Sequence, residues 1–178
     1  MPKNNQSLPT IVIGGGCFWC LDAAYKLAKG ITKVEQGYSG GNVTITDDYQ
    51  VSAGNTGQAE VVQLTYNPKI ISLADILDVF WTIHDPTTPN RQGYDVGPQY
   101  RSIILYMDDD QKLIIDNSLK QARKIWGNKI VTEIKPFKQF YPAGKYQKDY
   151  ELNRPDYCQL IINPKLSKLR EKFAALIA

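Results

Sequence analysis

Three cysteines are the residues of this sequence best suited to chemistry. Cys17 and Cys20 bracket Phe18 and Trp19 in the stretch GGGCFWC, and Cys158 lies near the C-terminus. Two thiols three residues apart share one face of a helix, and such pairs can cycle between a dithiol and a disulfide. The spacing therefore predicts a redox site at Cys17 and Cys20.

The position of Cys17 indicates how its thiol could be activated. A strand is expected before it and a helix after it, which places Cys17 in the first helical turn, near free amide groups and the positive end of the helix dipole. A thiol in such a position can have its pKa lowered from about 8.5 to between about 3.5 and 7.5. Gly14, Gly15 and Gly16 are expected to form a turn that exposes the sulfur. The alternative is a glycine turn with an inert, buried thiol.

Two other chemistries fit the cysteine pair less well. A zinc site would need four ligands, and only Cys158 and His84 remain as further sulfur or nitrogen ligands. A thioredoxin-like disulfide oxidoreductase fits the spacing, but bulky Phe18 and Trp19 favour an apolar substrate group over an extended protein disulfide. His84, the only histidine, is expected to cap a helix end or pack there, since a cation suits the helix dipole.

Composition narrows the class of protein. The chain has 178 residues and a formal charge of +3, without a dense stripe of basic residues, so we expect no nucleic-acid partner. No apolar run approaches the roughly 20 residues of a membrane span, and the N-terminus MPKNNQSLPT does not resemble a signal peptide. We therefore expect a cytoplasmic protein with reduced thiols. A flexible tail (1–8) is expected to precede one catalytic domain (9–178).

The order of the elements predicts the fold. Strands are expected at 11–13, 31–38, 59–66, 102–107 and 129–134, and helices at 18–29, 73–84, 111–126 and from 164. Residues 41–58 and 85–99 are expected to be loops. Strand, helix, strand, strand, helix, strand is the order of a split βαβ unit. The prediction is an α/β, ferredoxin-like two-layer sandwich with helices on one face and a C-terminal extension.

Five motifs together resemble one family. GGGCFWC, GYSGG, TGQAEVV, HDPTTPNRQGYDVGPQYRS and DYCQLIINPKL follow in order from about Gly14 to Leu166. In this order they are similar to the motifs of the type A peptide methionine sulfoxide reductases. The resemblance implies thiol-dependent reduction of methionine S-sulfoxide, free or in proteins, and hence repair of oxidised proteins.

The resemblance also implies a role for four residues around the first motif and the third. Cys17 matches the catalytic cysteine, and Phe18 and Trp19 match the aromatic residues that hold the substrate methyl group; plain core packing is the alternative for these two. Glu60 in TGQAEVV matches the family's acid. At the start of an apolar strand its carboxyl would stay protonated by desolvation and could donate to the sulfoxide oxygen. An exposed carboxylate at the strand end is the alternative.

Three further residues take their roles from the resemblance alone. Tyr38 in GYSGG and Tyr100 in PQYRS match two tyrosines whose hydroxyls flank the sulfoxide oxygen. Asp95 in GYDVG matches the aspartate that orders the site and binds the substrate backbone, although an aspartate in a glycine-rich loop is otherwise often a turn former. The implied enzyme is a monomer and needs no metal or organic cofactor.

Turnover would require a second thiol. The resemblance implies that reduction leaves a sulfenic acid on Cys17, which a thiol condenses to a disulfide and an external dithiol, thioredoxin by analogy, reduces. Cys20 is close in sequence, whereas Cys158 matches a late resolving cysteine on a C-terminal segment (141–178). We expect a Cys17–Cys20 bond first and a Cys20–Cys158 bond second. The alternative is that Cys158 is a bystander.

Some positions depart from the family pattern. Gln58 stands where TGHAEVV has a histidine, and Gly144, Lys145 and Gln147 replace commoner residues in AGKYQKDY. These changes leave the nucleophile and the acid in place. We expect them to alter the hydrogen bonds around the site and the substrate affinity.

Overall fold

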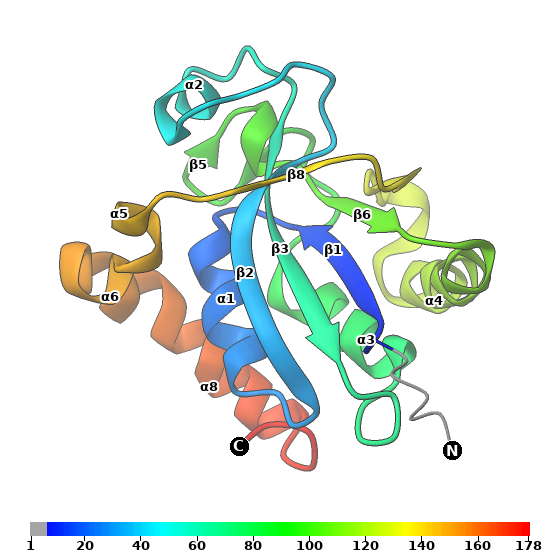
Figure 1. The fold of residues 1–178 in the computed structure, drawn as a ribbon. Helices are drawn as coiled ribbons and strands as arrows, with labels where there is room; N and C mark the ends of the chain where they lie inside the picture. Colours follow the sequence, from blue (N-terminus) through cyan, green and yellow to red (C-terminus); the bar gives the residue numbers. More distant parts are fainter. Residues whose placement is uncertain (1–6) are drawn as a thin grey trace, which may run out of the picture.

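A six-stranded sheet forms the centre of the computed structural model, which describes residues 7–178 (Figure 1). Its order is β7-β6-β1-β3-β2-β8, in which β6 and β7 are parallel and all other neighbours antiparallel. The strands are β1 (Thr10–Gly14), β2 (Ile31–Ser39), β3 (Ala59–Tyr66), β6 (Ile103–Tyr106), β7 (Glu133–Pro136) and β8 (Phe140–Pro142). Most of the predicted N-terminal tail, residues 1–6, lies outside the described residues.

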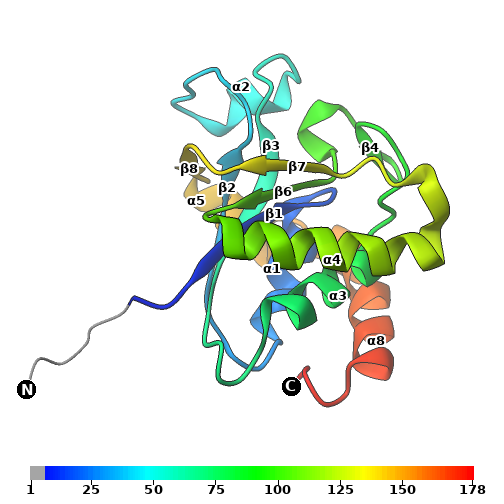
Figure 2. The ribbon, with the colours of Figure 1, turned by 90° about the vertical axis from the view of Figure 1, so that its right-hand side faces the viewer.

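The long helices lie on one face of this sheet (Figure 2). They are α1 (Phe18–Lys26), α3 (Leu73–Ile83), α4 (Asp109–Trp126) and α8 (Asn163–Lys172). The chain order β1, α1, β2, β3, α3, β6, combined with the sheet order β6-β1-β3-β2, is that of a split βαβ unit. The predicted ferredoxin-like α/β sandwich is therefore confirmed.

Alternation along the strands divides the apolar residues between two cores. Ile11 and Ile13 of β1 join the large core under the helices, whereas Val12 between them points to the opposite face. Side chains of a strand alternate between faces, so each face of β1 is buried. Phe137 and Phe140, from the segment that leads from β7 into β8, cover the smaller core.

Local signals in the sequence account for the helix ends. Ser72 and Asp75 form a reciprocal capping box at the start of α3, as their spacing predicts. The Asp108 side chain accepts from the backbone N–H of Gln111 at 2.8 Å and caps α4. Gly127, at φ +68°, ends that helix.

The structure corrects two predictions at the sheet edges. The strand predicted at 129–134 is β7 at Glu133–Pro136, because a 3₁₀ turn follows α4 and pairing with β6 begins only where Ile103 meets Glu133. The strand β8 was not predicted. It pairs with β2 along Gly37–Ser39, and a Cβ on Gly37 would lie 2.4 Å from the carbonyl oxygen of Tyr141. Gly37 therefore permits this pairing.

Both predicted long loops contain short elements. Residues 41–58 include α2 (Asp48–Ser52), and residues 85–99 include a hairpin of β4 (Arg91–Gln92) and β5 (Asp95–Val96), followed by the 3₁₀ turn η1 (Pro98–Tyr100).

The C-terminal extension is helical and packs against the domain. Its short elements are α5 (Lys145–Lys148), α6 (Tyr150–Asn153), α7 (Pro155–Tyr157) and the π-helical turn η3 (Cys158–Ile162), which leads into α8. Beyond α8, Ile177 pairs with Ala28 after α1. Among residues 7–178, no helix combines the length and apolarity required to cross a membrane.

Candidate active site

The three glycines before Cys17 let the turn from β1 to α1 lie against its neighbours. A Cβ on Gly14 would lie 2.6 Å from the carbonyl oxygen of Glu60, and one on Gly15 would lie 2.9 Å from the ring of His84. Gly16 has φ +91°, a backbone conformation that favours glycine. The glycines thus bring Cys17 close to β3 and to the end of α3.

The Cys17 thiol is buried at the N-cap of α1. The helix begins at Phe18, so Cys17 precedes the first turn rather than lying in it, and only 8% of the residue is exposed. Burial raises the pKa of Cys17 well above its ordinary value; the Glu60 and Cys20 charges raise it further, and a bond from the Trp19 amide opposes this rise. The predictions of an exposed sulfur and a lowered pKa are therefore wrong, because desolvation outweighs the helix terminus.

Glu60 lies beside Cys17 in a setting that favours a neutral carboxyl. It is the second residue of β3, pairs with Tyr38 of β2 and is partly buried. Burial raises the pKa of Glu60 to about 8, although the backbone N–H of Phe18, which donates to Oε2 at 3.1 Å, and a hydrogen bond with Cys17 oppose the rise. Near pH 7 the carboxyl is therefore mostly protonated. An exposed strand-end carboxylate is not what the structure shows.

Aromatic rings form an apolar wall next to the thiol. Phe18 and Trp19 are 1% and 8% exposed. Phe18 packs against Tyr38, with ring centroids 5.5 Å apart. Trp19 stacks on Tyr150 at 5.6 Å and meets the ring of Tyr157 nearly at a right angle at 5.4 Å. The wall therefore combines α1 and β2 with two rings from the C-terminal extension.

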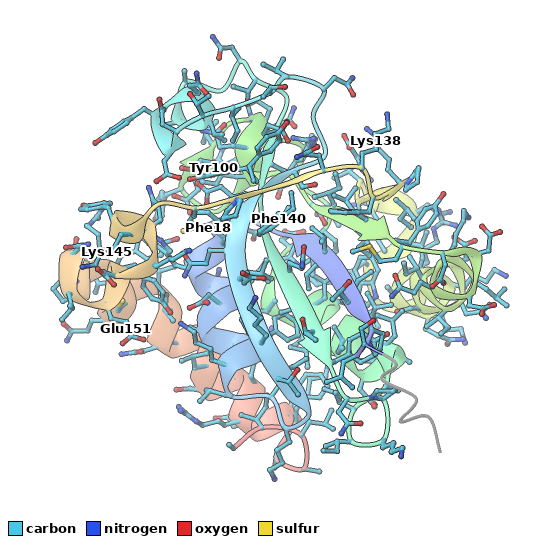
Figure 3. All side chains as sticks on the ribbon, in the orientation of Figure 1. Phe18, Tyr100, Lys138, Phe140, Lys145 and Glu151 are labelled. Atoms are coloured by element: carbon cyan, nitrogen blue, oxygen red, sulfur yellow. The ribbon has the colours of Figure 1, made fainter. Side chains whose placement is uncertain are left out.

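The hydroxyls of Tyr38 and Tyr100 remain protonated and can donate. Burial raises the pKa of Tyr38, as does a hydrogen bond with Asp48. Burial also raises the pKa of Tyr100, and the charges of Glu60 and Cys17 add to this effect. Phe18 and Tyr100 lie at the same end of the sheet (Figure 3). The structure therefore brings both tyrosines to the carboxyl and the thiol.

Asp95 is held by a residue that the sequence did not single out. Its Oδ2 accepts from the hydroxyl of Tyr157 at 2.9 Å, and the same hydroxyl lies 3.9 Å from Cys20 Sγ. Lys165 of α8 donates to Cys20 Sγ at 3.4 Å. Tyr157 precedes Cys158 directly in DYCQL, and Lys165 belongs to the same motif. Membership of this motif was the only signal in the sequence that pointed to Tyr157 and Lys165. A motif does not show which side chains come into contact in the folded protein.

Cys158 lies at the start of η3 and is half-buried, and all three cysteines are free thiols. Burial raises the pKa of Cys158, and the charges of Glu151 and Cys20 raise it further. Cys20 therefore affects the pKa values of both other thiols. The structure brings all three cysteines into one region.

His84 is a buried packing residue at the end of α3. Its Nδ1 lies 2.6 Å from the Phe80 carbonyl oxygen, and its Nε2 lies 2.8 Å from Ser102 Oγ. Burial lowers the pKa of His84 to about 4, so the ring is neutral near pH 7. The prediction that it caps or packs agrees with this geometry. The expected positive charge is wrong, because full burial disfavours a cation.

Two departures from the family pattern have structural partners. The Gln58 side chain accepts from the Gly41 N–H at 3.1 Å and donates to the Val43 carbonyl at 2.7 Å, so it holds the loop after β2. The Gly144 N–H donates to both carboxylate oxygens of Asp48 at 3.1 Å. Asp48 in turn raises the pKa of Tyr38. Both departures therefore affect the surroundings of the site.

Within residues 7–178, no group of three or more His, Cys, Asp or Glu side chains lies close enough together to hold a metal ion.

The fold and the site define a cysteine-based enzyme, and comparison with known proteins identifies its family. The family model for peptide methionine sulfoxide reductase matches residues 9–176. The chain belongs to this family, and it is a methionine sulfoxide reductase.

Both sequence relatives and solved structures agree with this assignment. Peptide methionine sulfoxide reductase MsrA of Pseudarthrobacter chlorophenolicus is 46% identical over 170 residues, which are 94% of this chain and 98% of the relative. MsrA of Saccharolobus solfataricus is 49% identical over 163 residues, 90% of this chain and 92% of the relative. Reduced Mxr1 from Saccharomyces cerevisiae is 34% identical with a TM-score of 0.79, covering 86% and 90% of the two chains. Mxr1 in complex with Trx2 has a TM-score of 0.61 at 28% identity, covering 83% and 89%.

Proposed function

We propose that this enzyme reduces the S epimer of methionine sulfoxide, free or in proteins, through a sulfenic acid on Cys17 and a subsequent disulfide. The observation that carries the proposal is the buried Cys17 thiol next to the carboxyl of Glu60, whose pKa burial raises to about 8. A sulfoxide has an apolar methyl group beside a strongly polar S–O bond. The aromatic wall suits the methyl group, and the protonated carboxyl suits the oxygen.

The first half-reaction transfers one oxygen atom. The sulfur of Cys17 attacks the sulfoxide sulfur while Glu60 donates its proton to the oxygen, with the hydroxyls of Tyr38 and Tyr100 as further donors. The S–O bond of the substrate breaks, an S–O bond to Cys17 forms, and methionine leaves. The thiol proton of Cys17 restores the proton of Glu60. Methionine is thereby reduced and Cys17 is oxidised to a sulfenic acid.

The second half-reaction restores Cys17 through the other two thiols. Cys20 attacks the sulfenic sulfur of Cys17 and hydroxide leaves as water, which forms a Cys17–Cys20 disulfide. The Cys158 thiolate then attacks Cys20, so that Cys17 is released and a Cys20–Cys158 disulfide remains. The effect of Cys20 on the pKa values of both partners supports its place between them. A bystander role for Cys158 is the alternative.

An external dithiol closes the cycle. The complex of Mxr1 with Trx2 supports a thioredoxin as this reductant. The proposed enzyme acts as a cytoplasmic monomer, and the sulfur chemistry of its three cysteines requires no metal or organic cofactor.

The reductase step is tested with dithiothreitol as the only reductant. We expect Cys17→Ser to form no methionine, because a serine hydroxyl is a much weaker nucleophile than a thiol and cannot form a sulfenic acid. We expect Glu60→Gln to slow the single-turnover rate by roughly 10²- to 10⁴-fold, the usual contribution of a general acid. Appreciable turnover in Cys17→Ser would refute the nucleophile. A rate in Glu60→Gln within a few-fold of the parent would refute the acid.

The relay is tested by disulfide mapping. One equivalent of a methionine sulfoxide peptide is added without reductant, and disulfides are mapped by mass spectrometry in the parent, Cys20→Ser and Cys158→Ser proteins. A Cys17–Cys20 bond should accumulate when Cys158 is missing. Normal turnover of Cys20→Ser with thioredoxin, through a direct Cys17–Cys158 bond, would contradict the relay and leave Cys20 as a packing residue.

A further inference from the structure

Cys20 differs from the other two cysteines in having a cationic partner. Nζ of Lys165 donates to Cys20 Sγ at 3.4 Å. Lys165 lies in the first turn of α8, which packs against α1 (Figure 1). Cys20 is 2% exposed and Lys165 is half-buried. Among residues 7–178, no other lysine or arginine donates to a cysteine sulfur.

The other groups that face Cys20 carry no positive charge. The Tyr157 hydroxyl lies 3.9 Å from its sulfur, and the charge of Asp95 disfavours a Cys20 thiolate. Burial raises the pKa of Cys20, and it outweighs the charge and the hydrogen bond of Lys165 and the bond to Tyr157, which lower that pKa. Cys17 and Cys158 are the remaining titratable neighbours. Among the residues that the structure describes, Lys165 is therefore the one cationic group that donates to Cys20 and favours its thiolate.

A thiolate is the form in which a cysteine attacks another sulfur atom. We propose that Lys165 is a positioning residue that increases the thiolate fraction of Cys20 and directs its sulfur for attack on the oxidised Cys17. This inference rests on the proposed function, because it concerns the step that follows the sulfenic acid.

The step balances without a further reactant. The Cys20 thiolate attacks the sulfur of the Cys17 sulfenic acid, so that the S–S bond forms as the S–O bond breaks. The departing hydroxide takes up a proton and leaves as water. Cys20 released one proton to solvent when it formed the thiolate, and the hydroxide takes up one proton, so there is no net change in protons. Lys165 remains an ammonium group throughout.

The first measurement concerns the Cys20 thiol itself. In a Cys17→Ser/Cys158→Ser background Cys20 is the only cysteine, and its ionisation is followed by thiolate ultraviolet absorbance against pH. Lys165→Met should raise the pKa of Cys20, because it keeps the side-chain length and removes the charge. Lys165→Arg, which keeps a charge, and Lys168→Met, which changes an exposed lysine on the same helix, should both titrate like the background protein.

The second measurement concerns the disulfide step. In a Cys158→Ser background, one equivalent of sulfoxide is added, and methionine and the Cys17–Cys20 disulfide are quantified after rapid quenching. Methionine formation is the internal reference for each variant. We expect Lys165→Met to lower the disulfide rate relative to the methionine rate by roughly 3- to 10-fold, since a smaller thiolate fraction is partly offset by higher nucleophilicity.

The outcomes separate the two proposals. An unchanged Cys20 titration and an unchanged rate ratio in Lys165→Met would overturn the role of Lys165 and leave the proposed function intact. Absence of methionine in the Cys158→Ser background itself would instead refute the proposed function. Should Lys165→Met fail to fold, Lys165→Gln, which also lacks the charge, makes the same comparison.

Discussion

At the residue scale, one buried environment keeps both the nucleophile and the acid protonated. Desolvation raises the pKa of Cys17 and moves that of Glu60 to about 8, so both groups are mostly neutral near pH 7. A thiol and a carboxyl that are buried next to each other can exchange a proton without the participation of bulk solvent. The helix terminus at Phe18 contributes its N–H to the carboxyl of Glu60, at 3.1 Å.

The raised pKa of Glu60 makes stability depend on pH. Between 4.5 and about 8 the folded protein binds more protons at Glu60 than the unfolded chain does, so this contribution to stability is lost as pH rises through that window. At about 1.4 kcal/mol for each pH unit, the loss is at most about 5 kcal/mol. Thermal unfolding of the parent and of Glu60→Gln is compared from pH 5 to pH 8. The parent should lose stability relative to the variant; parallel curves would show that Glu60 ionises normally.

At the scale of elements, the C-terminal extension is part of the site. Tyr150 of α6 and Tyr157 of α7 both pack on Trp19, and Tyr157 also donates to Asp95. The hydroxyl of Tyr150 donates to the buried carboxylate of Asp22 at 3.0 Å. Elements about 130 residues downstream in the chain thus position the first helix.

Tyr150→Phe tests this connection. The variant keeps the stacked ring and removes the hydrogen bond to Asp22, whose carboxylate retains the ammonium of Lys26 at 2.6 Å. We expect the free energy of unfolding, measured with urea, to fall by about 1–2 kcal/mol. Tyr146→Phe, at a side chain that is 58% exposed, is the matched control and should be neutral. Equal stability of the two variants would show that the buried bond contributes nothing net.

At the scale of the whole molecule, the three thiols differ in their access to a partner protein. Cys17 and Cys20 are 8% and 2% exposed, whereas Cys158 is half-buried on the extension. A protein dithiol must reach the sulfur that it attacks, whereas a small dithiol can enter a narrow opening. Cys158 is therefore the thiol best placed to present a disulfide to thioredoxin.

The Cys158→Ser variant tests whether thioredoxin and dithiothreitol attack different sulfur atoms. The variant should still turn over with dithiothreitol, because Cys17 and Glu60 are unchanged. With thioredoxin we expect turnover to fall about tenfold or more, since the remaining disulfide is buried. Steady-state rates with each reductant, measured beside the parent, give the comparison. Equal rates with thioredoxin would place its point of attack at Cys17 or Cys20.

Local patterns determined most of the central fold. The bounds of β3 (Ala59–Tyr66) and the start of α3 after Ser72 agree with prediction, because apolar alternation and helix caps are properties of neighbouring residues. The three-residue β8 has no such pattern. Its place depends on Gly37, about 100 positions earlier in the chain, which lets the backbone of Tyr141 approach.

For the site, the sequence by itself identified the cysteines, Glu60 and the family, since these depend on residue types in order. Only the tertiary structure decided that the pKa of Cys17 is raised, because desolvation depends on everything packed around the thiol. It alone also placed Tyr157 beside Asp95 and Lys165 beside Cys20. These pairs lie 62 and 145 positions apart, and no local pattern records which distant side chains the folded chain brings into contact.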